Sequence, residues 1–223
     1  LAISGGYLYR IFDISPTVAV TVTDLALIEG RAPNGESGGA IRSRGQLQLL
    51  RVDLQDNLST YRGGAVAVDQ GTVWIESSTV QSNTSAGGGA IFLYRSSGAI
   101  TGTVLAKNEG SAIGSDLWSA ACITGTQIIS NTGRGVDAKS TALSLLDVKV
   151  MGNEGGGVAR HARHVEVEGH RAGRTLPQGQ DLAPLIVPAP EHAVVLAREA
   201  PRPAPSTIRG AILGPSSLKL PFG

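Results

Sequence analysis

The chain has 223 residues with a formal net charge of +1, 41% hydrophobic residues, 4% aromatic residues and 30 glycines. A nearly neutral chain lacks the concentrated basic surface that captures nucleic acid, so we expect no nucleic-acid partner. No stretch approaches the roughly 18 consecutive apolar residues of a transmembrane helix, and the single cysteine excludes an intrachain disulfide. Many glycines and few aromatic residues indicate short strands joined by tight turns around a narrow core.

Two phrases recur along the chain after an early pair of alternating apolar segments at 9–14 and 18–22. The first phrase, Gly-Gly-Ala followed by Val or Ile, begins in full or altered form at Gly38, Gly63, Gly88, Gly110, Gly133 and Gly155. The second is an apolar residue, two variable residues and an asparagine, at Asn57, Asn83, Asn108, Asn131 and Asn153. A period in the twenties predicts stacked coils that bury their apolar faces only against their neighbours.

Short segments between these phrases alternate apolar and polar residues, as in 46–49, 72–75 and 142–145. Alternation with a period of two predicts strands, and no segment shows helical periodicity. A leucine-rich repeat would need its own leucine frame, and a propeller blade needs about 40 residues. We therefore predict an all-β fold over residues 1–173, namely a right-handed parallel β-helix of about seven coils.

The recurring asparagines are predicted to form a structural column. An amide has both a donor and an acceptor, so it can bond to its equivalents in neighbouring coils. We also expect each asparagine to adopt the left-handed conformation of a sharp corner. Gly30 stands where the first asparagine would be. Asn57 and Asn83 lie in N-glycosylation sequences, but the structural role is favoured.

The composition changes at about Arg174, beyond which nine of the eleven prolines lie. Proline cannot donate to a strand ladder, so residues 174–223 are predicted to be an irregular Pro-rich tail, either a linker or a C-terminal cap. The chain begins at Leu1 without a leader sequence. We expect it to be a piece of a longer protein whose signal peptide has been removed.

The paired phrases Gly-Gly-Ala-Ile and apolar-x-x-Asn resemble the repeats of bacterial extracellular β-helix proteins. These are the arrays of polymorphic outer-membrane proteins and autotransporter passengers, and the segment 3–30 is similar to the start of such arrays. The resemblance covers about residues 1–173. It implies an extracellular or cell-surface location and a structural or adhesive role. The implied partners are a polysaccharide, a host or cell-surface ligand, or other copies of the chain.

One outward column of side chains is the candidate site. The register of the Gly-Gly-Ala phrase aligns, at the end of one strand in successive coils, Arg44, Asp69, Tyr94, Asp116, Lys139 and His161. We predict a ligand-contact face, for a glycan or a surface partner, made of Arg44, Asp69, Tyr94, Arg95 and Asp116. A simply solvated polar face is the other interpretation of this column.

The alternative function is a polysaccharide lyase or glycoside hydrolase that uses Asp69 and Asp116 with Lys139. The two acidic residues would lie two coils apart, about 9.6 Å between their backbones, a separation that suits an inverting carboxylate pair. The sequence contains no closely packed acidic cluster, so binding is favoured over catalysis and no catalytic residue is assigned.

Metal and thiol chemistry receive little support from the sequence. His161, His164 and His170 match the spacing of no named metal site, and arginines interrupt them. The calcium-binding glycine-rich nonapeptide frame is also absent. We therefore predict no metal and no cofactor. Cys122 lies in the apolar segment 120–123, where we expect a buried, inert thiol.

Overall fold

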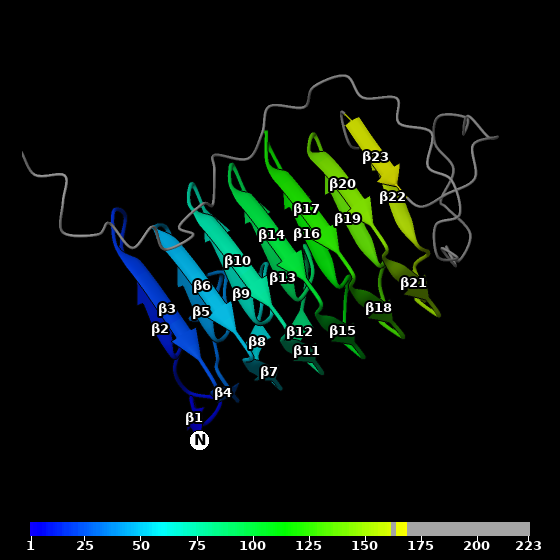
Figure 1. Ribbon diagram of the computed structural model, residues 1–223. Helices are drawn as coiled ribbons and strands as arrows, with labels where there is room; N and C mark the ends of the chain where they lie inside the picture. Colours follow the sequence, from blue (N-terminus) through cyan, green and yellow to red (C-terminus); the bar gives the residue numbers. More distant parts are fainter. Residues whose placement is uncertain (162–163, 169–223) are drawn as a thin grey trace, which may run out of the picture.

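The computed structural model describes residues 1–161 and 164–168, and these form a rod of three parallel sheets (Figure 1). Each sheet contains one strand from each coil and has seven strands. The predicted parallel β-helix is confirmed, with six repeat steps between the first and the last strand of a sheet. Residues 174–223, the predicted tail, lie outside the described residues.

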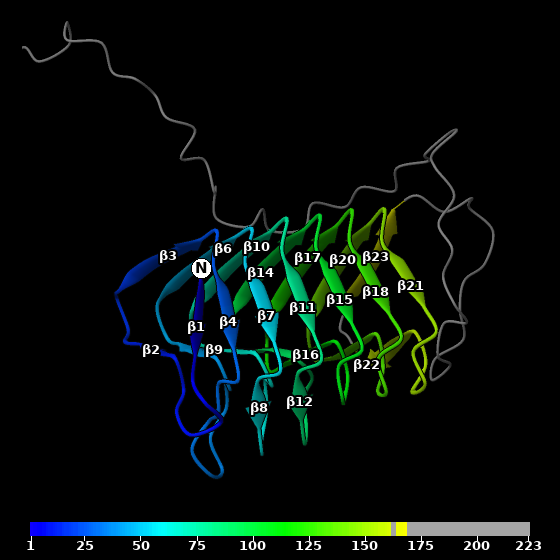
Figure 2. The ribbon, with the colours of Figure 1, turned by 90° about the horizontal axis from the view of Figure 1, so that it is seen from below.

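Along the chain, successive strands join sheets A, B and C in turn, and this order repeats in each coil (Figure 2). Sheet A consists of β1 Ala2–Ser4, β4 Ala26–Ile28, β7 Asp53–Gln55, β11 Thr79–Gln81, β15 Val104–Ala106, β18 Gln127–Ile129 and β21 Lys149–Met151. Sheet B consists of β2 Phe12–Ile14, β5 Ile41–Ser43, β9 Val66–Asp69, β13 Ile91–Tyr94, β16 Ile113–Asp116, β19 Val136–Lys139 and β22 Val158–His161.

Sheet C consists of β3 Ala19–Thr23, β6 Gln46–Leu50, β10 Thr72–Glu76, β14 Ser97–Thr101, β17 Ala120–Thr124, β20 Ala142–Leu146 and β23 His164–Glu168. Two further short strands, β8 Leu58–Ser59 and β12 Thr84–Ser85, pair between sheets A and B. In the described part of the chain, no helix is long and apolar enough to cross a membrane.

Along each strand inward-pointing side chains alternate with outward-pointing ones, and the inward-pointing side chains fill the narrow core. In sheet C, for example, Leu47, Leu49, Val73 and Ile75 point inward and are almost fully buried, while their neighbours face outward. The same periodicity in sheets A and B gives one continuous apolar core along the rod. Since each coil pairs only with the coils before and after it, every strand depends on its neighbours for burial.

The asparagine column is buried at the corner between sheets A and B. Asn57, Asn83, Asn108 and Asn131 are fully shielded from solvent. Each Nδ2 donates to the Oδ1 of the next asparagine at 2.8–3.0 Å, ending at Asn153, and each also donates to a backbone carbonyl one coil back. The predicted ladder is therefore confirmed. Because their amides are occupied, neither Asn57 nor Asn83 can accept a glycan in the folded chain.

The predicted left-handed conformation of these asparagines is wrong. Positive φ falls instead on the residue before the column position, which is Glu29, Asp56, Ser82, Lys107, Ser130 or Gly152. The asparagine that follows is thereby directed inward, where its amide reaches the next coil. Gly30 takes the first place in the column, and its backbone N–H donates to Asn57 Oδ1 at 2.7 Å.

Candidate functional site

Charge is distributed unequally over the three outer faces. In strands β2 to β19 of sheet B, six of the ten outward positions carry a charge: Asp13, Arg42, Asp69, Asp116, Asp137 and Lys139. In strands β3 to β20 of sheet C, Glu76 is the one charged outward residue. In sheet A the outward charges are Asp53 and Lys149. Outward positions are therefore not uniformly polar, and the face of sheet B differs from the other two.

The predicted column of sheet B has the expected register. Tyr94 pairs with Asp69 on one side and with Asp116 on the other, and Lys139 pairs with His161. Asp69 and Asp116 therefore lie two coils apart, with Tyr94 between them in the column. This separation by an aromatic side chain does not favour their joint action on one bond.

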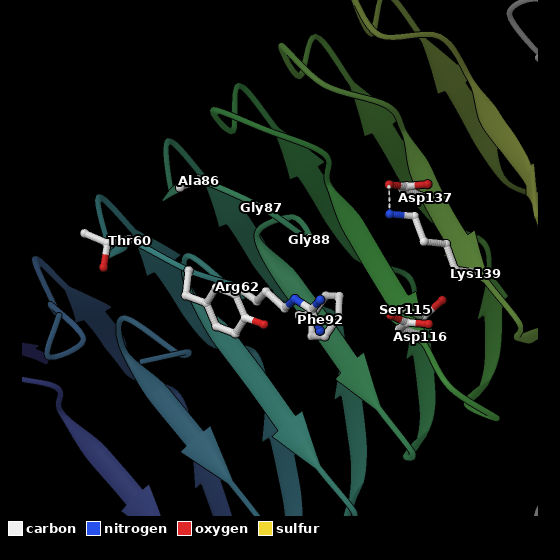
Figure 3. Close-up of a pocket in the computed structure, with 11 residues that line it drawn as sticks. Thr60, Arg62, Ala86, Gly87, Gly88, Phe92, Ser115, Asp116, Asp137 and Lys139 are labelled. Atoms are coloured by element: carbon white, nitrogen blue, oxygen red, sulfur yellow. Dashed lines mark ion pairs between the residues drawn. The ribbon is translucent and has the colours of Figure 1, made fainter. Parts of the chain in front are cut away.

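A groove of about 280 Å³ crosses this face from the loop before β9 to strand β19 (Figure 3). Two loops form one side, with Thr60–Arg62 from the coil of β9 and Ala86–Gly88 from the coil of β13. Sheet B supplies Phe92, Ser115, Asp116, Asp137 and Lys139. The groove thus spans four consecutive coils, or about 14 Å at the usual strand spacing.

One end of the groove is built around Arg62. Its guanidinium lies 4.7 Å from the ring centre of Phe92 and 4.8 Å from that of Tyr61. Phe92 is only 6% exposed, whereas Tyr61 is 47% exposed. The two rings hold the guanidinium by cation–π attraction and restrict its position. Figure 3 shows Arg62 lying against Phe92.

The other end carries two carboxylates and a lysine. The carboxylate of Asp137 lies 3.8 Å from Lys139 Nζ and 3.8 Å from Arg134 Nη1, which is too long for a hydrogen bond in either case. Its Oδ1 is covered from solvent and has no hydrogen-bond partner among the described residues. Asp116 Oδ1 accepts a hydrogen bond from the backbone N–H of Leu117 at 2.8 Å. Because Asp137 Oδ1 is covered, the acceptors that face the groove are Asp137 Oδ2 and the carboxylate of Asp116.

Glycines allow the loop 86–88 to lie on the sheet. A Cβ at Gly114 would overlap the carbonyl oxygen of Gly88, and a Cβ at Gly88 would approach Phe92 Cδ2 at 2.5 Å. Gly88 also has a φ of +83°, which favours glycine. The loop can form this wall of the groove only because Gly88 and Gly114 are glycines, which have no side chain.

A separate charged network holds the N-terminal end of the same face. Arg10 is nearly buried and bonds to Asp13 at 2.9 Å, to Glu36 at 2.6 Å and to the carbonyl oxygens of Ser37 and Gly38. Arg42 also pairs with Glu36. The hydrogen bond from Arg10 lowers the pKa of the Glu36 carboxyl. This network fixes the long loop between β4 and β5, so it is structural.

Among the predicted contact residues, only Asp116 lines the groove, and Lys139 from the alternative catalytic set lines it too. Arg44, Asp69, Tyr94 and Arg95 lie on the same face outside the groove. Arg44 pairs with Asp13 at 3.5 Å, and Arg95 lies over the ring of Tyr94 at 5.4 Å. Four of the five predicted contact residues therefore lie beside the groove, on the same face of sheet B.

Sequence reasoning missed Tyr61, Arg62, Phe92 and Asp137. Phe92 and Asp137 occupy the second outward column of sheet B, two residues before Tyr94 and Lys139, and alternation would have shown them. Tyr61 and Arg62 lie in an irregular loop whose path has no periodic signal.

Two remaining predictions concern metals and the cysteine. Among the described residues, no group of three or more histidine, cysteine or acidic side chains is placed to hold a metal ion. His164 lies in β23, and His170 is outside the described residues. The expectation of a buried Cys122 is wrong. Its neighbours Ala121 and Ile123 point inward, so the thiol is exposed on the outer face of sheet C.

Comparison of the chain with protein-family models, curated proteins and solved structures found no match in any of the three.

Proposed function

We propose that the chain is a structural or adhesive β-helix module that binds a glycan in the groove on sheet B. The concentration of charge on this one face supports the proposal, since the faces of sheets A and C carry few charges. A groove that crosses four coils suits a linear chain of sugar units, which presents many hydroxyl donors. The carboxylates of Asp116 and Asp137 are acceptors for such donors, and Arg62 and Lys139 are donors for sugar oxygens.

The proposed location is outside the cell or at its surface, and the proposed source is bacterial. The support is the resemblance of the repeat phrases to those of bacterial extracellular β-helix arrays, together with a fold of the same class. Self-association of the rods also remains a proposal. Light scattering of the purified chain over a range of concentrations tests it.

A polysaccharide-active enzyme is the second candidate, because two carboxylates and a lysine share one groove. Glycoside hydrolysis uses a carboxylate pair, in which one member acts as acid and the other as base or nucleophile. In this structure the pair would be Asp116 and Asp137, with Lys139 beside them. Asp69 is outside the groove and no longer belongs to the set.

Glycan-array binding and product analysis together test the proposal. The chain should retain glycans on an array without releasing new reducing ends or unsaturated products. The double variant Asp116→Asn/Asp137→Asn should lose this binding, whereas Glu76→Gln on sheet C should keep it. Product formation abolished by the double variant would support the enzyme instead. Absence of binding to any glycan would contradict the proposed function.

A further inference from the structure

Resting on the proposed function, we infer that the groove selects an acidic sugar unit flanked by a neutral one. The carboxylate of a uronic acid would pair with Arg62, while hydroxyls of the neighbouring neutral unit would donate to Asp116 and Asp137. The two ends of the groove differ in chemistry, and this difference sets the selectivity.

Arg62 is a cation held between two aromatic rings, with no acidic partner in the part of the chain that the structure describes. Its guanidinium contacts the rings of Tyr61 and Phe92, and no carboxylate among the described residues pairs with it. The other arginines of this face with defined partners, Arg10, Arg42 and Arg44, each bind an acidic side chain. Ring contacts do not use up the five N–H donors of a guanidinium as an ion pair does, so donors remain for a ligand. Such an arrangement fits a carboxylate, which can accept two parallel hydrogen bonds.

The acidic end of the groove has the opposite preference. Arg62 belongs to the coil of β9, whereas Asp116 and Asp137 belong to the two coils of β16 and β19. Because the Arg62 guanidinium lies over Phe92 in β13, Asp116 and Asp137 are one and two strand steps beyond it, about 5 and 10 Å along the rod. A second carboxylate at this end would face two negative side chains, and the nearby cations Lys139 and Arg134 already lie 3.8 Å from Asp137. A neutral unit avoids that repulsion and supplies hydroxyl donors.

This charge pattern distinguishes three kinds of polysaccharide. A neutral polysaccharide offers no carboxylate to Arg62. A chain with an acid on every unit places one carboxylate against Asp116 and Asp137. An alternating chain satisfies both ends, so we expect the order of affinity to be alternating, then uniformly acidic, then neutral.

The test is calorimetric titration of the full chain with three probes of defined charge. These are a hyaluronan tetrasaccharide (alternating), tetragalacturonate (acidic at each unit) and chitotetraose (neutral). We expect Arg62→Gln to weaken hyaluronan binding by about tenfold or more and to leave chitotetraose binding nearly unchanged. Arg62→Lys keeps the charge without the planar fork and should give a smaller loss. Asp137→Asn should improve tetragalacturonate binding relative to hyaluronan.

Arg95→Gln is the matched control, since Arg95 is another arginine over a single tyrosine ring on the same face but outside the groove. It should change hyaluronan affinity less than twofold (about the error of such a comparison). An equal loss in Arg95→Gln, or no loss in Arg62→Gln, would overturn the inference. Chitotetraose binding as tight as hyaluronan binding would also overturn it while leaving the proposed glycan function intact. If the chain bound none of these probes and nothing on the array, the proposed function itself would fail.

Discussion

Asn108 shows how a buried polar residue can organise an apolar core. Its side chain donates to Val80 O at 3.0 Å and to Asn131 Oδ1 at 2.9 Å, and its Oδ1 accepts from both the backbone and the side chain of Asn83. All its polar atoms are therefore paired, as a group without solvent contact requires. The column links the coils without placing an unpaired polar group in the core.

We expect Asn108→Leu to destabilise the chain by about 3 kcal/mol or more. The substitution removes these bonds, including the acceptor for the buried backbone N–H of Asn83 and the donor to the carbonyl oxygen of Val80. Urea denaturation followed by circular dichroism measures the effect. Asn153→Leu is the control, since Asn153 is partly exposed at the end of the described ladder and should cost less. An unchanged urea midpoint for Asn108→Leu would refute the contribution of the ladder.

Lys107, directly before this asparagine, has a φ of +54°. A left-handed backbone costs a residue with a Cβ about 1 kcal/mol, and glycine avoids this cost. We therefore expect Lys107→Gly to stabilise the chain by a few tenths to about 1 kcal/mol, although it adds freedom to the unfolded state. Gln127→Gly, at an exposed position in strand β18, should have the opposite sign because that backbone is extended. A lower urea midpoint for Lys107→Gly would show that the corner is not strained.

At the scale of the element, each coil has three corners, and each corner carries its own polar column. Besides the asparagines, Ser78, Thr103 and Thr126 line up between sheets C and A, and Ser96, Ser119 and Thr141 between sheets B and C. Most of these hydroxyls donate to a carbonyl two residues back and accept from the backbone of the preceding coil. These side chains link their corners to the adjacent coil, whereas Val52 and Val148 hold the same place between sheets C and A, and Gly45 and Gly71 between sheets B and C.

The ion pair between Asp24 and Arg51 predicts the acid response of one corner. The hydrogen bond from Arg51 lowers the pKa of Asp24 to about 2, whereas an unfolded aspartate titrates at about 3.9. Because folding lowers this pKa, the ion pair contributes its full stabilisation at pH values above the pKa of Asp24 in the unfolded chain. The contribution is lost as the pH falls from about 4 through about 2. Asp24→Asn should flatten the loss of urea stability over this window.

Asp53→Asn is the control, because its effect on stability should be opposite in sign to that of Asp24→Asn. Burial, with the nearby Asp56 charge, raises the pKa of the Asp53 carboxyl, so ionised Asp53 disfavours the folded state at neutral pH. Asp53→Asn should therefore raise the urea midpoint at pH 7, where Asp24→Asn should lower it slightly. Identical pH profiles for both variants and the parent chain would contradict these assignments.

Gly114 connects the stability of strand β16 to the shape of the groove. A Cβ there would meet the Gly88 carbonyl and Phe92 Cδ2, so Gly114→Ala should displace the loop 86–88 and cost about 1–3 kcal/mol. It should also weaken glycan binding. Gly102→Ala is the control for glycan affinity, since its φ of +56° makes alanine costly to stability while the position is remote from the groove. Full glycan affinity in Gly114→Ala would show that the loop does not shape the site.

At the scale of the whole molecule, the repeat made the fold predictable. The fixed spacing of Asn57, Asn83 and Asn108 determined the coil register, and alternation determined which side chains face inward. The same alternation, applied to 120–123, would have placed Cys122 outside. The repeat also aligned Asp69, Tyr94 and Asp116 correctly, because that column follows from strand pairing alone.

The groove was not predictable in the same way. It depends on the loops 60–62 and 86–88, which interrupt the repeat, and on contacts between coils that are far apart in sequence. Arg62 acquires its significance only when Phe92, thirty residues later, lies beneath it. Local patterns carry no information about such a contact, so residues beside the groove were predicted in place of those lining it.

The central claim is that a glycan occupies the groove of sheet B. Photo-crosslinking tests it most directly, with an array-selected glycan that carries a photoreactive group and mass spectrometry to locate the modified residues. We expect modification within 60–62, 86–88, β16 and β19, with competition by the unlabelled glycan. Crosslinks that map to the outer faces of sheets A or C, and that the unlabelled glycan suppresses, would contradict the account.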